Sequence, residues 1–140
     1  MPLRKAEAVW EGNFAEGKGT YTVAGLTGAY TRASRFEEAA GSNPEELLGA
    51  AHAACYSMAL SAQLSRAEFP PKRVHTTAQV SLEKVEEGFK IKKITLNVEA
   101  EVPGIDAALF MEKAETAKKT CPISVALGAI DEIVLNAKLI

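Results

Sequence analysis

Apolar and polar residues alternate over short stretches near the start of the chain, which is the pattern of half-buried strands. Residues 6–10 form the first stretch, and Tyr21 and Val23 alternate with threonines in the second. Residues 30–36 form a third, weaker strand candidate after turn-prone glycines. The pattern predicts a small meander of N-terminal strands over about residues 4–36.

A long apolar block in the middle of the chain predicts a central helix over about residues 44–65. Asn43 is suited to cap this helix, Pro44 suits its first turn, and the two glutamates that follow favour its positive end. Nearly every position over 47–60 is apolar or small. A helix that is apolar on all sides is a buried one, and the Phe-Pro-Pro segment at 69–71 ends it.

Alternation returns after the central helix and predicts a hairpin over about residues 73–102. The apolar positions are odd-numbered at Phe89 and Ile91 but even-numbered from Ile94 onwards. A β-bulge near Lys92 is therefore needed to keep both apolar sets on one face of the sheet.

The last third of the chain predicts helices over about residues 106–128 and a final strand over about 132–139. Asp106 is the candidate cap of the first of these helices. Strands and helices do not alternate as parallel crossover units require. The pattern therefore predicts an α+β fold with mainly antiparallel sheets.

The composition and charge of the chain indicate its domain count and exclude some classes of partner. Its 140 residues, 47% of them apolar and 24% charged, predict one globular domain over 1–140. The net charge is −2 and the basic residues are scattered, so no nucleic-acid partner is expected. We find no signal peptide and no run of about 18 apolar residues, and therefore expect no membrane association and a cytoplasmic location.

The two cysteines differ in their local surroundings. In a reducing cytoplasm they are more plausibly reactive or buried than joined in a permanent disulfide. Cys55 lies in an alanine-rich buried helix, where a cysteine is usually a small packing residue and burial raises its pKa. Cys121 precedes Pro122 at a helix start, where the helix dipole favours a thiolate. Local signals alone thus favour Cys121 as the nucleophile.

Two other interpretations of these residues remain open. His52 shares a helix face with Cys55, so the two could form the couple of a Cys-dependent hydrolase, although packing is the commoner role. Together with Cys121 and His75 they show no spacing typical of zinc sites, and no metal or cofactor is expected. The second alternative is a non-catalytic stress-binding domain, in which both cysteines are packing residues. A thioredoxin-fold peroxiredoxin is disfavoured, because Leu48 and His52 occupy its motif positions before Cys55.

Three sequence motifs contain both cysteines and the charged residues near the central helix. They are Arg35-Phe36-Glu37, the block from Gly41 to Leu60, and Cys121-Pro122-Ile123-Ser124. With these motifs the chain resembles the OsmC/Ohr family of osmotically inducible and organic hydroperoxide resistance proteins, most closely the OsmC branch. The resemblance implies an OsmC-like fold, with sheets around a buried central helix in an intertwined homodimer. It also implies thiol-dependent reduction of organic hydroperoxides and, less efficiently, of hydrogen peroxide.

The resemblance assigns four residues and reverses the local choice of nucleophile. It makes Cys55 the peroxidatic cysteine and Cys121 the resolving one. It makes Arg35 the group that stabilises the thiolate and peroxide, and Glu45 the partner that orients Arg35. An external dithiol, for which a lipoylated protein is the candidate, would reduce the resulting disulfide.

Helix geometry adds one constraint to this assignment. Glu45 and Cys55 are ten residues apart on the predicted helix, which corresponds to about 15 Å. Either Arg35 bridges that gap or a second subunit supplies the Arg–Glu pair.

Overall fold

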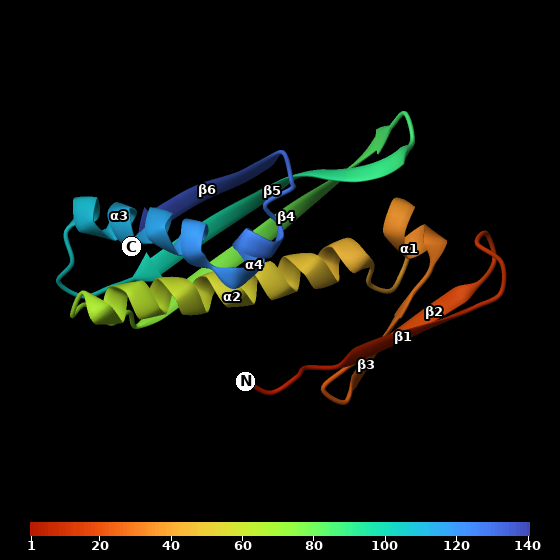
Figure 1. Ribbon diagram of the computed structural model, residues 1–140, viewed down its shortest axis with the longest axis horizontal. Coiled ribbons are helices and arrows are strands. Elements are labelled where there is room, and N and C mark those ends of the chain that lie inside the picture. Colours follow the sequence, from red (N-terminus) through yellow and green to blue (C-terminus); the bar gives the residue numbers. More distant parts are fainter. The chain divides into compact units, whose positions relative to one another are not determined.

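A three-stranded antiparallel sheet forms the beginning of the chain (Figure 1). The computed structural model describes residues 1–140, which divide into two compact units at residues 1–47 and 48–140. The first sheet contains β1 (Ala6–Glu11), β2 (Lys18–Val23) and β3 (Leu26–Tyr30) in that order. Ala24 and Gly25 join β2 to β3 with positive φ angles of 49° and 82°, as a two-residue hairpin turn requires.

The predicted strand over residues 30–36 is wrong beyond Tyr30, because α1 (Arg32–Phe36) is a short helix. Thr31 and Ser34 form a capping box that starts it. The Ser34 backbone amide donates to Thr31 Oγ1 at 3.0 Å, and the Thr31 amide donates to Ser34 Oγ at 2.8 Å. These reciprocal bonds satisfy backbone groups that a strand would have to pair with a neighbour.

The second sheet contains β4 (Arg73–Val85), β5 (Gly88–Glu101) and β6 (Glu132–Leu139). β4 and β5 form the predicted hairpin, and its bulge is confirmed: Ser81 faces Lys93 and Leu82 faces Ile91, which leaves Lys92 as the extra residue. β6 pairs with β5 in parallel. Parallel strands need a long crossover, which α3 (Ala107–Thr120) and α4 (Pro122–Ala126) provide. The other three strand pairings are antiparallel, as the predicted α+β class requires.

One face of this second sheet packs against the helices, including α2 (Pro44–Arg66). The core combines residues of α2, β5 and α3, the largest of them being Tyr56, Phe110, Leu60, Leu64, Ile94 and Leu96. In the single chain only one side of α2 is buried, and Ala51, Ala54 and Met58 are exposed on another side. None of the helices combines the length and hydropathy that a membrane crossing requires.

Candidate active site: a thiol pair and an Arg–Glu pair

Cys55 and Cys121 are in direct contact although 66 residues separate them in the chain. Cys55 lies on α2, and Cys121 is the residue before α4. The Cys121 thiol donates a hydrogen bond to Cys55 Sγ at 2.8 Å, and both cysteines are unbridged. Cys121 is fully buried, whereas Cys55 is half-buried. Thiols at this separation need only a small movement to form a disulfide.

The electrostatic environment of Cys55 contains opposing contributions. Burial raises the pKa of the Cys55 thiol, and its contact with Cys121 raises it further. The backbone amide of Ile123 donates a hydrogen bond to the same sulfur and lowers the pKa. The net shift is upward, so the Cys55 thiolate needs a cation near it to form readily at neutral pH.

The position of Ile123 bears on the choice between the two cysteines, for which local signals favour Cys121 and the family resemblance favours Cys55. Ile123 lies in the first turn of α4, and the sulfur that its amide contacts is that of Cys55. The Ile123 amide at the start of α4 thus lowers the pKa of Cys55, because α4 packs with its first turn toward α2. No pattern within a few residues of either cysteine contains this information.

His52 does not pair with Cys55 in the structure. Its ring is fully buried, and Nε2 lies 2.7 Å from Ser124 Oγ on α4. Nδ1 has no hydrogen-bond partner, and burial lowers the pKa of the imidazole, which keeps it neutral at pH 7. The Cys–His couple of a hydrolase therefore has no geometric support.

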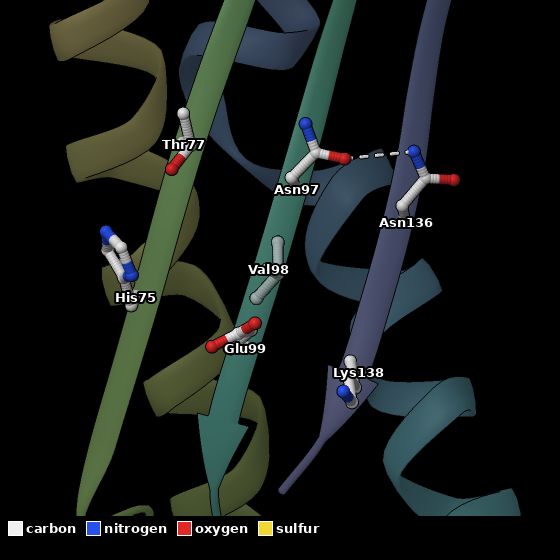
Figure 2. A pocket seen from close by; sticks show the side chains of 7 residues that line it. All are labelled: His75, Thr77, Asn97, Val98, Glu99, Asn136 and Lys138. Carbon is white, nitrogen blue, oxygen red and sulfur yellow. Dashed lines mark hydrogen bonds between the residues drawn. The ribbon is translucent and has the colours of Figure 1, made fainter.

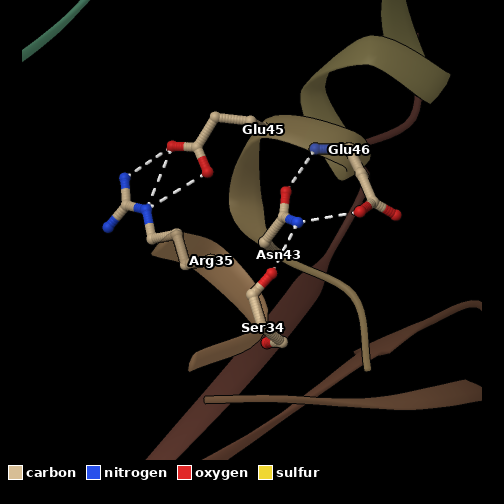
Figure 3. Close-up of polar contacts among 5 residues, drawn as sticks. All are labelled: Ser34, Arg35, Asn43, Glu45 and Glu46. Carbon is tan, nitrogen blue, oxygen red and sulfur yellow. Dashed lines mark hydrogen bonds and ion pairs between the residues drawn. The ribbon is translucent and has the colours of Figure 1, made fainter. Parts of the chain in front are cut away.

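Arg35 on α1 holds Glu45, in the first turn of α2, with two of its nitrogens (Figure 3). Nε donates to both carboxylate oxygens at 3.1 Å, and Nη2 donates to Oε1 at 2.6 Å. Glu45 is 10% exposed and Arg35 36% exposed. The third nitrogen, Nη1, makes no hydrogen bond within the chain and stays available to a ligand.

A polar network next to this pair fixes the junction between α1 and α2 (Figure 3). The Glu46 amide donates to Asn43 Oδ1 at 2.8 Å, which confirms Asn43 as the cap of α2. Asn43 Nδ2 donates to Ser34 O at 3.1 Å and to Glu46 Oε1 at 2.8 Å. Ser34 Oγ also donates to Ser42 O at 2.7 Å. Sequence reasoning found the cap but missed Ser34, which the Thr-x-x-Ser spacing of a capping box could have indicated.

Arg35 also lines a pocket of about 240 Å³ that sequence reasoning missed. Its walls are mostly aromatic and come from separate elements: Trp10, Phe14, Tyr30 and Phe36, with Pro44. Arg32, the other arginine of α1, lines the same pocket but forms an exposed ion pair with Glu37 at 3.1 Å. The two arginines therefore differ in their carboxylate partners, because Glu45 beside Arg35 is buried and Glu37 beside Arg32 is exposed.

A second hollow lies on the outer face of the β4-β5-β6 sheet, with a volume of about 290 Å³ (Figure 2). Figure 2 shows the helices behind the sheet and polar side chains such as His75, Asn97 and Glu99 in front of it. The sheet thus separates His75 from Cys55 and Cys121, which belong to the helix side. No three His, Cys, Asp or Glu side chains are grouped as metal ligands.

Residues 37–135 match the model of the family described as OsmC-like protein. The chain belongs to this family. It is 50% identical over 139 residues to Peroxiredoxin OsmC of Escherichia coli (strain K12), covering 97% of this chain and 96% of that protein. It is 33% identical over 107 residues to the organic hydroperoxide resistance protein OhrA of Bacillus subtilis (strain 168), covering 75% and 72%.

Solved structures of the OsmC family have the same fold. An OsmC-like protein from Mycoplasma pneumoniae superposes with a TM-score of 0.80 at 18% identity, over 99% of this chain and 98% of that one. The organic hydroperoxide resistance protein OhrB of Bacillus subtilis superposes with a TM-score of 0.70 at 25% identity, over 99% and 100%. The predicted α+β, OsmC-like fold class is confirmed.

Proposed function

We propose that this chain is a peroxidase that reduces organic hydroperoxides, and hydrogen peroxide less efficiently, through a two-cysteine cycle. Its relatives named above carry the names peroxiredoxin and organic hydroperoxide resistance protein. The observation that carries the two-cysteine mechanism is the 2.8 Å contact between Cys55 and Cys121 across 66 residues of chain. This direct contact places the two sulfurs where a disulfide can form.

In the first step, the Cys55 thiolate attacks the distal oxygen of the hydroperoxide. The O–O bond breaks, the alkoxide takes up a proton and leaves as the alcohol, and Cys55 becomes a sulfenic acid. Arg35 supplies the cation that the raised pKa of Cys55 calls for, and its Nη1 binds a peroxide oxygen. Glu45 orients the guanidinium through the bidentate pair and does not act as a base.

In the second step, Cys121 acts as the resolving cysteine. Its thiol attacks the Cys55 sulfenic acid, which forms the disulfide and releases water. An external dithiol then reduces the disulfide by thiol–disulfide exchange, and a lipoylated protein is our candidate for this partner. We place the cycle in the cytoplasm, where thiols are kept reduced.

The pocket beside Arg35 favours an organic substrate over hydrogen peroxide. Its aromatic walls offer apolar surface to the carbon chain or ring of a hydroperoxide, while the guanidinium offers donors to the peroxide group. Hydrogen peroxide has no apolar part to bury, so it gains nothing from these walls.

We further propose that residues 1–140 act as one OsmC-like domain that works as an intertwined homodimer. Ala51, Ala54 and Met58 lie one helical turn apart on an exposed side of α2, and Met58 is 76% exposed. An apolar stripe on the longest helix of the chain fits a second copy of the same chain.

Substitution of each cysteine tests the cycle. Cys55→Ser is expected to abolish hydroperoxide reduction, because it removes the nucleophile. Cys121→Ser is expected to react once and then stall as a sulfenic or over-oxidised Cys55. Mass spectrometry after one equivalent of an alkyl hydroperoxide distinguishes these products. The roles are reversed if Cys121 becomes oxidised in the absence of Cys55 and Cys55 stays a thiol in the absence of Cys121.

A further inference from the structure

We infer that His52 and Ser124 are positioning residues for the thiol pair: their hydrogen bond holds the first turn of α4 against α2, so that Cys121 captures the Cys55 sulfenic acid before further peroxide does. This inference rests on the proposed two-cysteine cycle and adds two residues to it. Neither residue touches the peroxide in this role.

Two contacts between α2 and α4 lie side by side. His52 is three residues before Cys55 on α2, and Ser124 is three residues after Cys121, so each pair shares one face of its segment. His52 Nε2 meets Ser124 Oγ at 2.7 Å, and Cys121 Sγ meets Cys55 Sγ at 2.8 Å. A displacement that breaks the first contact therefore also separates the two sulfurs.

α4 needs such an attachment because it has little stability of its own. It is five residues long, far below the length at which a helix is stable in isolation, and no side chain caps its start. Ile123 packs against the core, but Val125 is 64% exposed. The same short helix carries the Ile123 amide that hydrogen-bonds to Cys55.

The burial of His52 is itself informative. Its side chain is 0% exposed and Nδ1 has no partner, so the ring loses hydrogen bonds to water that the protein does not fully replace. An apolar side chain would fill the same space without that cost. The bond to Ser124 is the compensation that the structure shows, and it links the two segments that carry the thiols.

The consequence concerns the fate of the sulfenic acid. Condensation joins Cys55 to Cys121 and releases water, whereas a second hydroperoxide molecule oxidises the same sulfur to sulfinic acid and is itself reduced to the alcohol. The ratio of these products depends on how often Cys121 lies next to Cys55. Loss of the His52–Ser124 bond would lower that frequency and raise the sulfinic fraction.

The first measurement does not require peroxide. The full-length protein is equilibrated in glutathione redox buffers, and the effective concentration of the two thiols is read from the fraction of disulfide. Ser124→Ala, which deletes one oxygen, is expected to lower that concentration about tenfold. The matched control is Ser57→Ala, which removes a 2.8 Å hydrogen bond between α2 and Thr76 on β4. It is expected to change the effective concentration of the thiols less than about twofold.

Variants of His52 separate positioning from loss of packing. His52→Gln, whose amide nitrogen can reach Ser124, is expected to retain more of the effective concentration than His52→Ala. The double variant His52→Ala with Ser124→Ala should lose no more than His52→Ala alone, because both changes remove one shared bond.

The second measurement follows sulfinic acid on Cys55 by mass spectrometry after a pulse of alkyl hydroperoxide. We expect about tenfold less hydroperoxide to give half-maximal over-oxidation in Ser124→Ala than in the unsubstituted protein. An unchanged effective concentration in Ser124→Ala, or an equal loss in Ser57→Ala, overturns the inference and leaves the peroxidase proposal intact. Absence of any Cys55 oxidation by hydroperoxide in the unsubstituted protein overturns the proposed function instead.

Discussion

Arg35 contacts Glu45 through two of its three guanidinium nitrogens, and the third remains open beside an aromatic pocket. This arrangement uses the planar fork of the arginine, which can bind a carboxylate on one edge and present another donor elsewhere. A lysine carries the same charge on one nitrogen and has no second edge. A lysine at position 35 would therefore keep the positive charge but could not bind Glu45 on one edge and offer a donor on another.

Arg35→Lys is expected to lower kcat/KM for an alkyl hydroperoxide by about 10- to 100-fold, the effect of losing one or two charge-assisted hydrogen bonds. Steady-state kinetics with a dithiol reductant measures the change. Arg66→Lys, in the exposed last turn of α2, is the matched control and should leave kcat/KM unaltered. Equal kinetics for Arg35→Lys and the unsubstituted protein would remove Arg35 from the mechanism.

The start of α2 is stabilised by more than an ordinary helix cap. Asn43 accepts a hydrogen bond from the Glu46 amide and donates to both Ser34 O and Glu46 Oε1. Because Ser34 precedes Arg35 and Asn43 lies two residues before Glu45, this network orients both members of the Arg–Glu pair. Asp106 caps α3 by accepting one hydrogen bond of 2.9 Å from the Leu109 amide, and its side chain does not hold a neighbouring segment.

Asn43→Ala is expected to lower the free energy of unfolding by about 2 kcal/mol, because a cap and two further bonds are lost from a buried site. Asp106→Ala, the matched loss of a cap, should cost about 1 kcal/mol. Urea unfolding at one protein concentration measures both. We also expect peroxidase activity to fall in Asn43→Ala and to be kept in Asp106→Ala; the opposite order would show that the network has no part in positioning the pair.

At the scale of the whole molecule, the single chain leaves apolar surface exposed on α2 while its other side forms the core of the second unit. Exposed positions of a helix that packs on a sheet are usually polar, so Ala51, Ala54 and Met58 indicate a contact surface. The proposed homodimer would bury them.

Ala51→Glu is expected to shift the protein from dimer to monomer at micromolar concentration, because a carboxylate would be buried without a partner in the interface. Sedimentation equilibrium detects the shift, and peroxidase activity should fall with it. Ala108→Glu introduces the same group at an exposed position in the first turn of α3 and should leave the mass unchanged. A fully active monomer of the unsubstituted protein would contradict the proposed dimer.

Local chemistry in the sequence determined where most elements begin, end and bend. The caps Asn43 and Asp106 and the bulge at Lys92 are all where the pattern predicts them. Each depends on residues within about four positions or on the period of the apolar pattern, and both are visible in a sequence. The helical turn at 32–36 was missed because its capping box competes with a weak strand pattern over the same residues.

Only the tertiary structure decided which chemical groups meet. Cys55 contacts Cys121 across 66 residues, and His52 contacts Ser124 across 72. The resemblance to the OsmC/Ohr family named Cys55 as the nucleophile, whereas local signals favoured Cys121. The physical reason is that packing of α2, α4 and the second sheet around one core brings these segments together, and no single segment contains that information.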